Sequence, residues 1–325
     1  GWLIDRLGPR LFITIAGVLT GAGWAALSTA TTLPQLYTYY SLAGIGAALV
    51  YSGCIGSALK WFTDRRGLAS GIMAAGFGSG TALFIPFIAY AIRVHGYGKA
   101  FLWTGILQGF VIVVVAQFLR HPAADAKTGQ TAAAKSSQSR RNQEQFTTGE
   151  MLRTPHFYLL YLMFVMMATG GLLVTAQAGP VAQAWGLPLA ALTAATAMSP
   201  IANGASRVFW GWVSDRIGRE TTMAVAFFLQ AAALLSVLTL GRTSGTWFTI
   251  TLALTFFTWG EIFSLFPSTV GDWFGSRHAT SNYSFVYTAK GVAAILGGGL
   301  VAMLFQQFGS WSAAFYCSAT LALIA

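Results

Sequence analysis

Two basic residues lie deep inside apolar stretches of this sequence. Arg207 comes eight residues before the charged turn at Asp215, and Lys290 comes 13 residues after Arg277. At the rise of an α-helix, these spacings correspond to roughly 12 Å and 20 Å. A cation at such depth in a hydrocarbon core about 30 Å thick is costly unless it faces a cavity and meets an anion. The two residues therefore predict an anion-binding site.

The chemistry of the two side chains favours a small dicarboxylate. Arginine offers a planar fork that matches a carboxylate, and lysine offers a compact charge. Asn203, Tyr283 and Tyr287 lie at same-face helical spacings from the two cations, which supports one shared site. Two alternatives remain open. Arg207 could extend to the cytoplasmic face, or Lys290 could form a structural ion pair with Glu261.

Glu261 is the one acidic residue inside an apolar segment, in Trp259-Gly260-Glu261-Ile262-Phe263. An intramembrane carboxylate suggests proton coupling. However, Glu261 is two residues from both Trp259 and Phe263, about 200° around a regular helix. If those aromatics face the site, Glu261 points away from it. We therefore favour structural pairing or hydrogen bonding for Glu261 and keep proton coupling as the alternative.

The composition is typical of a polytopic membrane protein. Hydrophobic residues make up 55% of the chain and charged residues 9%, compared with about 25% charged residues in soluble domains. Most of the 19 Lys and Arg fall on one side of the apolar segments, and only Arg93, Lys99 and Arg242 on the other. This asymmetry predicts a multi-pass protein of a bacterial-type inner (plasma) membrane with its basic side in the cytoplasm, so the net charge of +10 reflects topology rather than nucleic-acid binding.

The apolar segments and an internal repeat predict an all-α helix bundle with two halves. Ten apolar segments lie near residues 11–30, 35–59, 67–92, 99–119, 156–179, 188–212, 220–240, 246–270, 280–305 and 311–325. Gly1-Trp2-Leu3-Ile4-Asp5-Arg6-Leu7-Gly8 recurs as Gly211-Trp212-Val213-Ser214-Asp215-Arg216-Ile217-Gly218, and Trp61-Phe62 recurs as Trp273-Phe274. The polar stretch 121–153 is expected to be a cytoplasmic linker between them.

The second half has two apolar segments before its Gly-Trp turn, whereas the first half has none. We therefore expect a fragment with about ten of twelve transmembrane helices. Its N-terminal half would be residues 1–120 and its C-terminal half residues 154–325.

A duplicated twelve-helix protein with Gly-x-x-x-Asp-Arg-x-Gly turns in both halves resembles the major facilitator superfamily. Within it, four runs are similar to the oxalate/formate antiporter family: Lys60-Trp61-Phe62-Thr63-Asp64-Arg65-Arg66-Gly67-Leu68-Ala69-Ser70-Gly71, Gly149-Glu150-Met151-Leu152-Arg153-Thr154-Pro155, Phe256-Phe257-Thr258-Trp259-Gly260 and Phe266-Pro267-Ser268. The segments around Arg207 and Lys290 match as well. The resemblance implies that the halves hold family helices 3–6 and 7–12, with the first two helices missing.

The resemblance also implies roles for particular residues. Arg207 and Lys290 would bind oxalate, and pocket aromatics would stand at Tyr51, Phe77, Trp259 and Phe263. With Asn203 and Tyr287 these residues form the predicted substrate site. Four residues of the cytoplasmic turns would take part in conformational change by latching helix ends: Asp5, Arg6, Asp215 and Arg216.

The predicted function is exchange of small carboxylates by alternating access, most specifically oxalate for formate, by a chain that works as a monomer. The alternative is a proton-coupled monocarboxylate symporter for lactate or pyruvate that uses Glu261. A non-transporting membrane sensor is a third reading, because a fold alone does not determine function. No nucleophile–base pair, metal-ligand spacing or phosphate-binding loop occurs, so we expect neither an enzyme nor a cofactor or metal.

Overall fold

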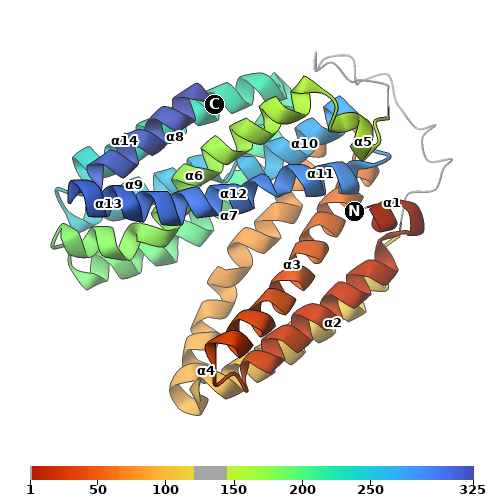
Figure 1. Ribbon diagram of the computed structural model, residues 1–325, viewed down its shortest axis with the longest axis horizontal. Helices are drawn as coiled ribbons and strands as arrows, with labels where there is room; N and C mark the ends of the chain where they lie inside the picture. The colour runs from red at the N-terminus through yellow and green to blue at the C-terminus, as the bar shows by residue number, and fades with distance from the viewer. Residues whose placement is uncertain (1, 121–144) are drawn as a thin grey trace.

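Two bundles of helices make up the structure (Figure 1). The computed structural model describes residues 2–120 and 145–325, so residues 121–144 of the expected linker lie outside the described residues. The regular structure of the described residues is helical throughout, which confirms the all-α fold class.

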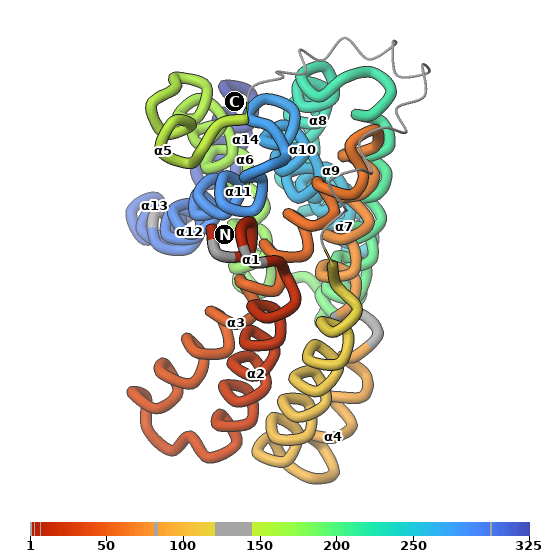
Figure 2. Tube along the Cα trace, turned by 90° about the vertical axis from the view of Figure 1, so that its right-hand side faces the viewer, coloured from red at the N-terminus to blue at the C-terminus, as the bar shows by residue number. Residues whose placement is uncertain are grey.

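The N-terminal bundle contains α2 (Pro9–Leu27), α3 (Leu33–Trp61) and α4 (Arg66–Ala116), preceded by the short α1 (Trp2–Leu7). Helix α4 folds back on itself at Gly96, where φ is 79°, a value that favours glycine (Figures 1 and 2). Its two arms correspond to the segments expected at 67–92 and 99–119. The non-helical backbone is confined to Gly96, so the turn is much shorter than the gap between those two expected segments.

The C-terminal bundle begins with the short α5 (Thr148–Met151) and continues with α6 (Pro155–Ala184), α7 (Leu189–Ile217) and α8 (Arg219–Ser236). The remaining helices are η3 (Val237–Gly241), α9 (Gly245–Trp259), α10 (Ile262–Phe274), α11 (Ala279–Tyr287), α12 (Ala289–Ile295), η4 (Leu296–Leu300), α13 (Val301–Phe308) and α14 (Ser312–Ile324). Three expected spans are therefore interrupted. Residues 220–240 and 280–305 contain wider helical turns, and 246–270 breaks at Gly260 and Glu261.

Among the described residues, seven helices are long and apolar enough to cross a membrane. The number is lower than the ten expected segments for three reasons. Both arms of α4 belong to one helix of 51 residues, and α14 has only 13 residues. Helix α7 is the third case, because Asn203, Arg207 and several serines lower its hydropathy.

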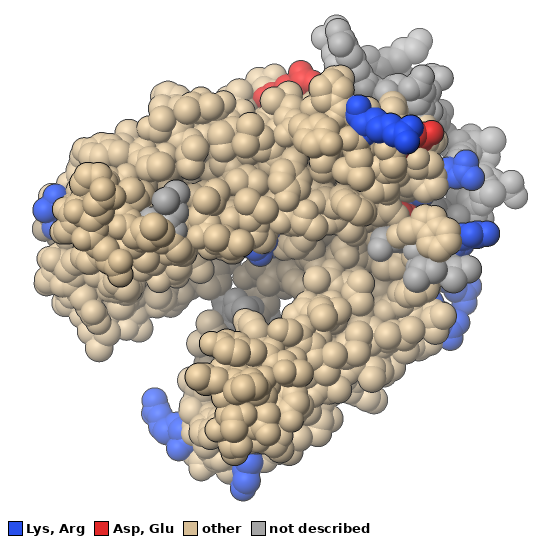
Figure 3. Space-filling view, viewed as in Figure 1, with Lys and Arg blue, Asp and Glu red and all other residues tan. Residues whose placement is uncertain are grey.

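The two bundles touch at one end and diverge at the other (Figure 1). They meet near α1, α5 and α11, whereas the turn of α4 and the α2–α3 connection lie far from the C-terminal bundle. A space-filling view shows the resulting notch between the bundles, with basic atoms visible inside it (Figure 3). The broad surfaces on either side of the notch are almost free of charge in this view, as expected for surfaces that face lipid.

Candidate substrate-binding site

Arg207 lies on α7, where its side chain crosses to the N-terminal bundle. Its Nε and one terminal nitrogen donate to Oδ1 of Asn203 over 3.1 and 2.6 Å, and the other terminal nitrogen donates to the carbonyl of Ala74 on α4 over 2.6 Å. Asn203 is itself oriented, because its amide nitrogen donates to the carbonyl of Phe256. The guanidinium is therefore held by oriented dipoles rather than by a carboxylate, and it does not extend to the cytoplasmic face.

Two glycines of α4 allow Arg207 to approach so closely. A Cβ atom at Gly78 would lie 2.8 Å from the guanidinium carbon, and one at Gly71 would lie 2.3 Å from the Arg207 carbonyl oxygen. A side chain at Gly71 would therefore collide with the backbone of α7, whereas one at Gly78 would displace the guanidinium of Arg207. The packing of α4 against α7 therefore depends on glycine where it passes Arg207.

Lys290 and Arg207 lie over the same aromatic ring. The guanidinium carbon of Arg207 is 3.9 Å from the ring centre of Phe263, and Nζ of Lys290 is 5.0 Å from it. Lys290 also donates to the hydroxyl of Tyr287 over 3.3 Å. Among the described residues neither cation forms an ion pair, so the alternative pair between Lys290 and Glu261 is wrong in this structure.

The predicted aromatic residues surround this pair of cations. Tyr51 on α3 contacts Tyr287 on α11, with ring centres 4.9 Å apart, and also contacts Phe77 on α4 at 4.9 Å. Trp259 at the end of α9 packs edge-on against Phe263 at 5.4 Å. All eight residues of the predicted substrate site are thus brought into one connected cluster from both bundles.

Tyr283 is a member of this cluster that the prediction treats only as a neighbour. It is fully buried, and its ring centre lies 5.6 Å from that of Tyr287 and 6.4 Å from that of Tyr51. The hydroxyls of Tyr51 and Tyr283 are buried and form no hydrogen bond within the described part of the chain. The signal in the sequence is the four-residue spacing of Tyr283 and Tyr287, which places both on one helix face.

Glu261 does not have the partner that the structural interpretation requires. Its side chain is fully buried at the break between α9 and α10, and neither carboxyl oxygen has a hydrogen-bond partner. The expectation of structural pairing or hydrogen bonding is therefore wrong for this structure. The physical reason is that the packing of the helices leaves the carboxyl group without a donor within hydrogen-bond distance among the described residues.

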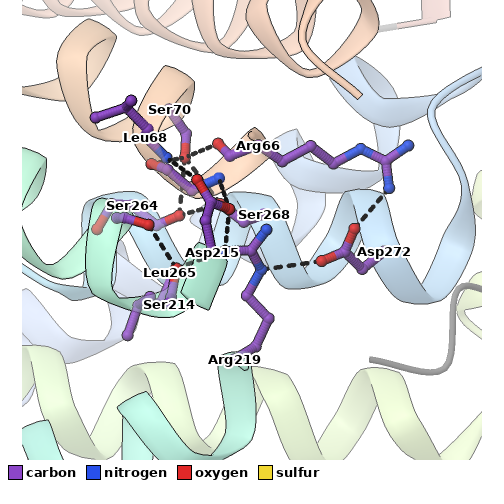
Figure 4. Close-up of polar contacts among 12 residues, drawn as sticks. Arg66, Leu68, Ser70, Ser214, Asp215, Arg219, Ser264, Leu265, Ser268 and Asp272 are labelled. Carbon is purple, nitrogen blue, oxygen red and sulfur yellow. Dashed lines mark hydrogen bonds and ion pairs between the residues drawn. The ribbon is translucent and has the colours of Figure 1, made fainter. Parts of the chain in front are cut away.

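A second polar cluster joins the bundles at their closed end (Figure 4). The carboxylate of Asp215, next to the end of α7, accepts from the backbone N–H groups of Gly67 and Leu68 over 3.0 and 2.8 Å, and so caps the first turn of α4. Arg219 bridges Asp215 and Asp272, and Asp272 pairs in turn with Arg66 at 2.7 Å. We call these four charged residues, Arg66, Asp215, Arg219 and Asp272, the inter-bundle network.

Asp5 makes the corresponding contact from the first Gly-Trp turn. Its carboxylate pairs with Lys60 at 2.6 Å and accepts from the backbone N–H and hydroxyl of Ser281 at the start of α11. Burial alone would raise the pKa of Asp5, but the charge of Lys60 and the hydrogen bonds lower the pKa below its ordinary value. Each Gly-Trp turn thus caps a helix of the opposite bundle.

Arg6 and Arg216, which the sequence predicts in the same role, lie outside these contacts. Arg216 stacks on Trp212 at 3.7 Å, and Arg6 lies 5.4 Å from the ring centre of Trp2, in each case at a spacing of four residues. The structure instead uses Lys60, Arg66, Arg219 and Asp272. Sequence reasoning treats the three basic residues only as cytoplasmic charges.

The comparison with protein families explains the repeated turns. The model of the Major Facilitator Superfamily matches residues 1–178 and, a second time, residues 158–325. The chain belongs to the Major Facilitator Superfamily. It is accordingly a multi-pass membrane transporter and not an enzyme.

Relatives and solved structures of the superfamily agree with this assignment. The chain is 40% identical to the oxalate:formate antiporter of Oxalobacter formigenes, over 100% of this chain and 76% of that protein, which confirms the resemblance predicted from the sequence. It is 26% identical to the uncharacterized MFS-type transporter YhjX of Escherichia coli, over 91% of this chain and 72% of YhjX. Its fold matches that of the human organic anion transporter MFSD10 with a TM-score of 0.74 at 15% identity, over 99% of this chain and 77% of that chain.

Proposed function

We propose that this transporter exchanges small carboxylates across a bacterial-type inner membrane, with oxalate moving inward and formate outward. The observation that carries the proposal is the pair of cations over Phe263, neither of which has a carboxylate partner among the described residues. A bound anion would stabilise these two positive charges, one on the buried Arg207 and one on the half-buried Lys290, which have no counterion in the described part of the chain.

The geometry favours a small dicarboxylate. Because Arg207 and Lys290 share one ring, a short dianion can reach both cations at once, one carboxylate to each. Among the described residues of the cluster, the members other than Arg207 and Lys290 are aromatic or amide side chains without charge. The 40% identity to an oxalate:formate antiporter supports oxalate and formate as the substrate pair.

The pair of cations also favours exchange over one-way transport. An empty site carries two positive charges, and moving them through the change of conformation without an anion is costly in a medium of low dielectric constant. Reorientation should therefore need a bound anion in each direction. This property distinguishes an antiporter from a channel or a sensor on the same fold.

The two Gly-Trp turns supply the conformational part of the cycle. In our proposal Asp5 and Asp215 hold the cytoplasmic end closed while the notch opens to the outside, and both contacts break when the halves 1–120 and 154–325 reorient about the 121–153 linker. The direction rests on the excess of basic residues at the closed end. All eight residues of the predicted site come from one chain, and in our proposal the transporter works as a monomer.

Counterflow in proteoliposomes tests the proposal. Vesicles that contain the full chain and are loaded with formate or oxalate should accumulate labelled oxalate from outside, whereas vesicles loaded with sulfate should not. Labelled lactate should not replace oxalate in this assay. Uptake that is independent of the internal anion would contradict exchange, and accumulation of lactate alone would favour the monocarboxylate alternative.

A further inference from the structure

Glu261 combines complete burial with the absence of any partner. Both of its carboxyl oxygens lack hydrogen-bond donors among the described residues, and the side chain has no exposed surface. An ionised carboxylate in that position would bear the full cost of desolvation without compensation. A buried acid of this kind inside a membrane span is a site where a proton can be held.

Among the described residues, the buried charged groups of the neighbouring helices are engaged elsewhere. On α7, Arg207 is held by Asn203 and Ala74. On α8, α4 and α3 the basic residues Arg219, Arg66 and Lys60 pair with Asp272 and Asp5 at the closed end, and Asp272 is the other acid of α10. The tyrosines of α6 and α11 form their hydrogen bonds with Thr288 and Lys290, and their rings pack against other aromatic rings. Glu261 thus faces no fixed counterion.

The backbone next to Glu261 nevertheless packs on the turn of α7 that carries Arg207. Gly260 is packed so tightly on α7 that a Cβ atom there would lie 1.9 Å from Oγ of Ser206 and 2.7 Å from the carbonyl of Asn203. Asn203 and Ser206 form the turn of α7 that ends at Arg207. Gly260 and Glu261 both keep right-handed helical angles, so Glu261 lies about one helical turn from the residues that hold the guanidinium. At this separation in a medium of low dielectric constant, its charge acts on the site.

A donor for the ionised form is available on the neighbouring helix α8. Thr258, three residues earlier on the same helix face, donates to the amide oxygen of Gln230 on α8, while the amide nitrogen of Gln230 is buried without an acceptor. The carboxylate that lacks donors is therefore three residues from the threonine that contacts an amide that lacks an acceptor. A small movement of α10 against α8 would let one satisfy the other.

We propose that Glu261 is a proton-binding site that balances the charge of the two substrates, an inference that rests on the proposed function. With oxalate bound, two cations and a dianion sum to zero if Glu261 carries its proton. With formate bound, two cations and a monoanion sum to zero only if Glu261 has released it. In our scheme the Glu261 carboxylate takes a proton from outside water as oxalate enters, which forms the O–H bond of the carboxyl group. On the cytoplasmic side this O–H bond breaks and the proton passes to inside water. The resulting carboxylate accepts a hydrogen bond from Gln230 while formate returns.

Charge movement gives the scheme a measurable consequence. Oxalate and one proton enter together with a net charge of minus one, and formate leaves with minus one, so each cycle moves no net charge. Without the proton the same exchange would carry one negative charge inward. Exchange of oxalate for formate should therefore acidify the vesicle interior and proceed at a rate that does not depend on an imposed membrane potential.

Glu261→Gln is the decisive variant, because glutamine has the same shape but holds no exchangeable proton. In proteoliposomes with a potassium-clamped potential, the wild-type chain should exchange oxalate for formate with internal acidification and no response to potential. E261Q should lose the acidification, respond to potential, and exchange oxalate for formate about tenfold or more slowly relative to its own oxalate–oxalate exchange. Measurable oxalate–oxalate exchange shows that the variant is folded. Glu220→Gln, an exposed glutamate at the start of α8, is the matched control and should behave as wild type.

The outcomes separate this inference from the proposed function. If the wild type exchanges oxalate for formate without acidification and responds to potential, the proton site is refuted while the proposed function stands. If the wild type exchanges neither anion, the proposed function fails. An infrared spectrum of the purified full chain then still tests Glu261, because a protonated carboxyl has its own carbonyl stretch. Its absence in the wild type at neutral pH, or its persistence in E261Q, would overturn the proposal even where that variant transports nothing.

Discussion

Arg207 is the residue on which the proposed site depends most directly. Its fork is aligned by two hydrogen bonds to one oxygen of Asn203. Arg207→Gln should weaken oxalate binding at least tenfold, because loss of a charged hydrogen-bond partner costs about 1.5–3 kcal/mol or more. Arg207→Lys should also weaken binding, since an ammonium cannot reproduce the planar fork. Calorimetric titration of the purified full chain with oxalate measures both effects.

Lys290 provides the comparison for that experiment. Lys290→Gln removes the second charge and should weaken binding by a similar factor, whereas Lys290→Arg should be milder if only the charge matters next to Tyr287. Wild-type affinity for oxalate in both Arg207→Gln and Lys290→Gln would remove the basis for this site.

Asn203 allows a test that adds charge rather than removing it. In Asn203→Asp a carboxylate would stand 2.6 Å from the guanidinium and pair with it. The internal anion should compete with the substrate, so oxalate affinity should fall at least tenfold while the fold is retained. Binding and thermal unfolding measured on the same sample separate the two effects. An unchanged affinity would show that Arg207 does not contact the substrate.

At the scale of elements, the contact between α4 and α7 joins the bundles beside the site. Gly71 faces the backbone of α7, where an added Cβ would lie 2.3 Å from a carbonyl oxygen, whereas Gly76 has nothing within 4 Å. Gly71→Ala should therefore destabilise this packing by about 1–3 kcal/mol. Gly76→Ala, on the same helix, should be neutral or slightly stabilising. Thermal unfolding in detergent measures both, and equal effects would contradict the role assigned to Gly71.

The spans were predictable from the sequence because they depend on local composition, but their interruptions were not. The break at Gly260 and Glu261 coincides with two side chains of α7 that bond to backbone carbonyls of α9. Trp210 donates to the carbonyl of Phe257, and Asn203 donates to that of Phe256. These donors are 47 and 53 residues away in the chain. No local pattern around Gly260 contains that information.

The two polar clusters differ in how far the sequence predicts them. The substrate cluster was predictable because a cation in an apolar segment is conspicuous on its own. The inter-bundle network was predicted only through Asp215 of the second Gly-Trp turn, since Arg66 and Asp272 are 206 residues apart and look like ordinary charges of cytoplasmic turns. Only the packing of α4 against α10 brings them together and buries them. Glu261 was recognised as unusual, but its lack of a partner depends on tertiary packing.

At the scale of the whole molecule, the closed end should resist mild acid. The pKa of Asp5 lies below its ordinary value in this conformation. The contribution of ionised Asp5 to the stability of the closed end is therefore complete above the pKa of an unperturbed aspartate, about 3.9. It is lost only as the pH falls through the lowered pKa of Asp5. Distances between spin labels across the closed end should stay constant from neutral pH down to about pH 5. Loosening within that range would show that another group controls closure.

The last prediction concerns the two aspartates that cap helices of the opposite bundle. Asp215 accepts two backbone N–H groups of α4, and Asp5 accepts two groups of Ser281. In Asp215→Asn or Asp5→Asn one oxygen becomes an amide nitrogen that cannot accept, so each variant should lose at most about 1.5–3 kcal/mol of closure. Shifting a conformational equilibrium from 99:1 to 1:99 takes about 5.5 kcal/mol. Either variant alone should therefore remain largely closed, whereas the double variant should populate both states.

Spin-label distances across the closed end and across the notch measure this directly. The closed end should widen and the notch should narrow together in the double variant. Widening of one end without narrowing of the other would mean that these contacts only stabilise the fold and do not set the balance between two transport states.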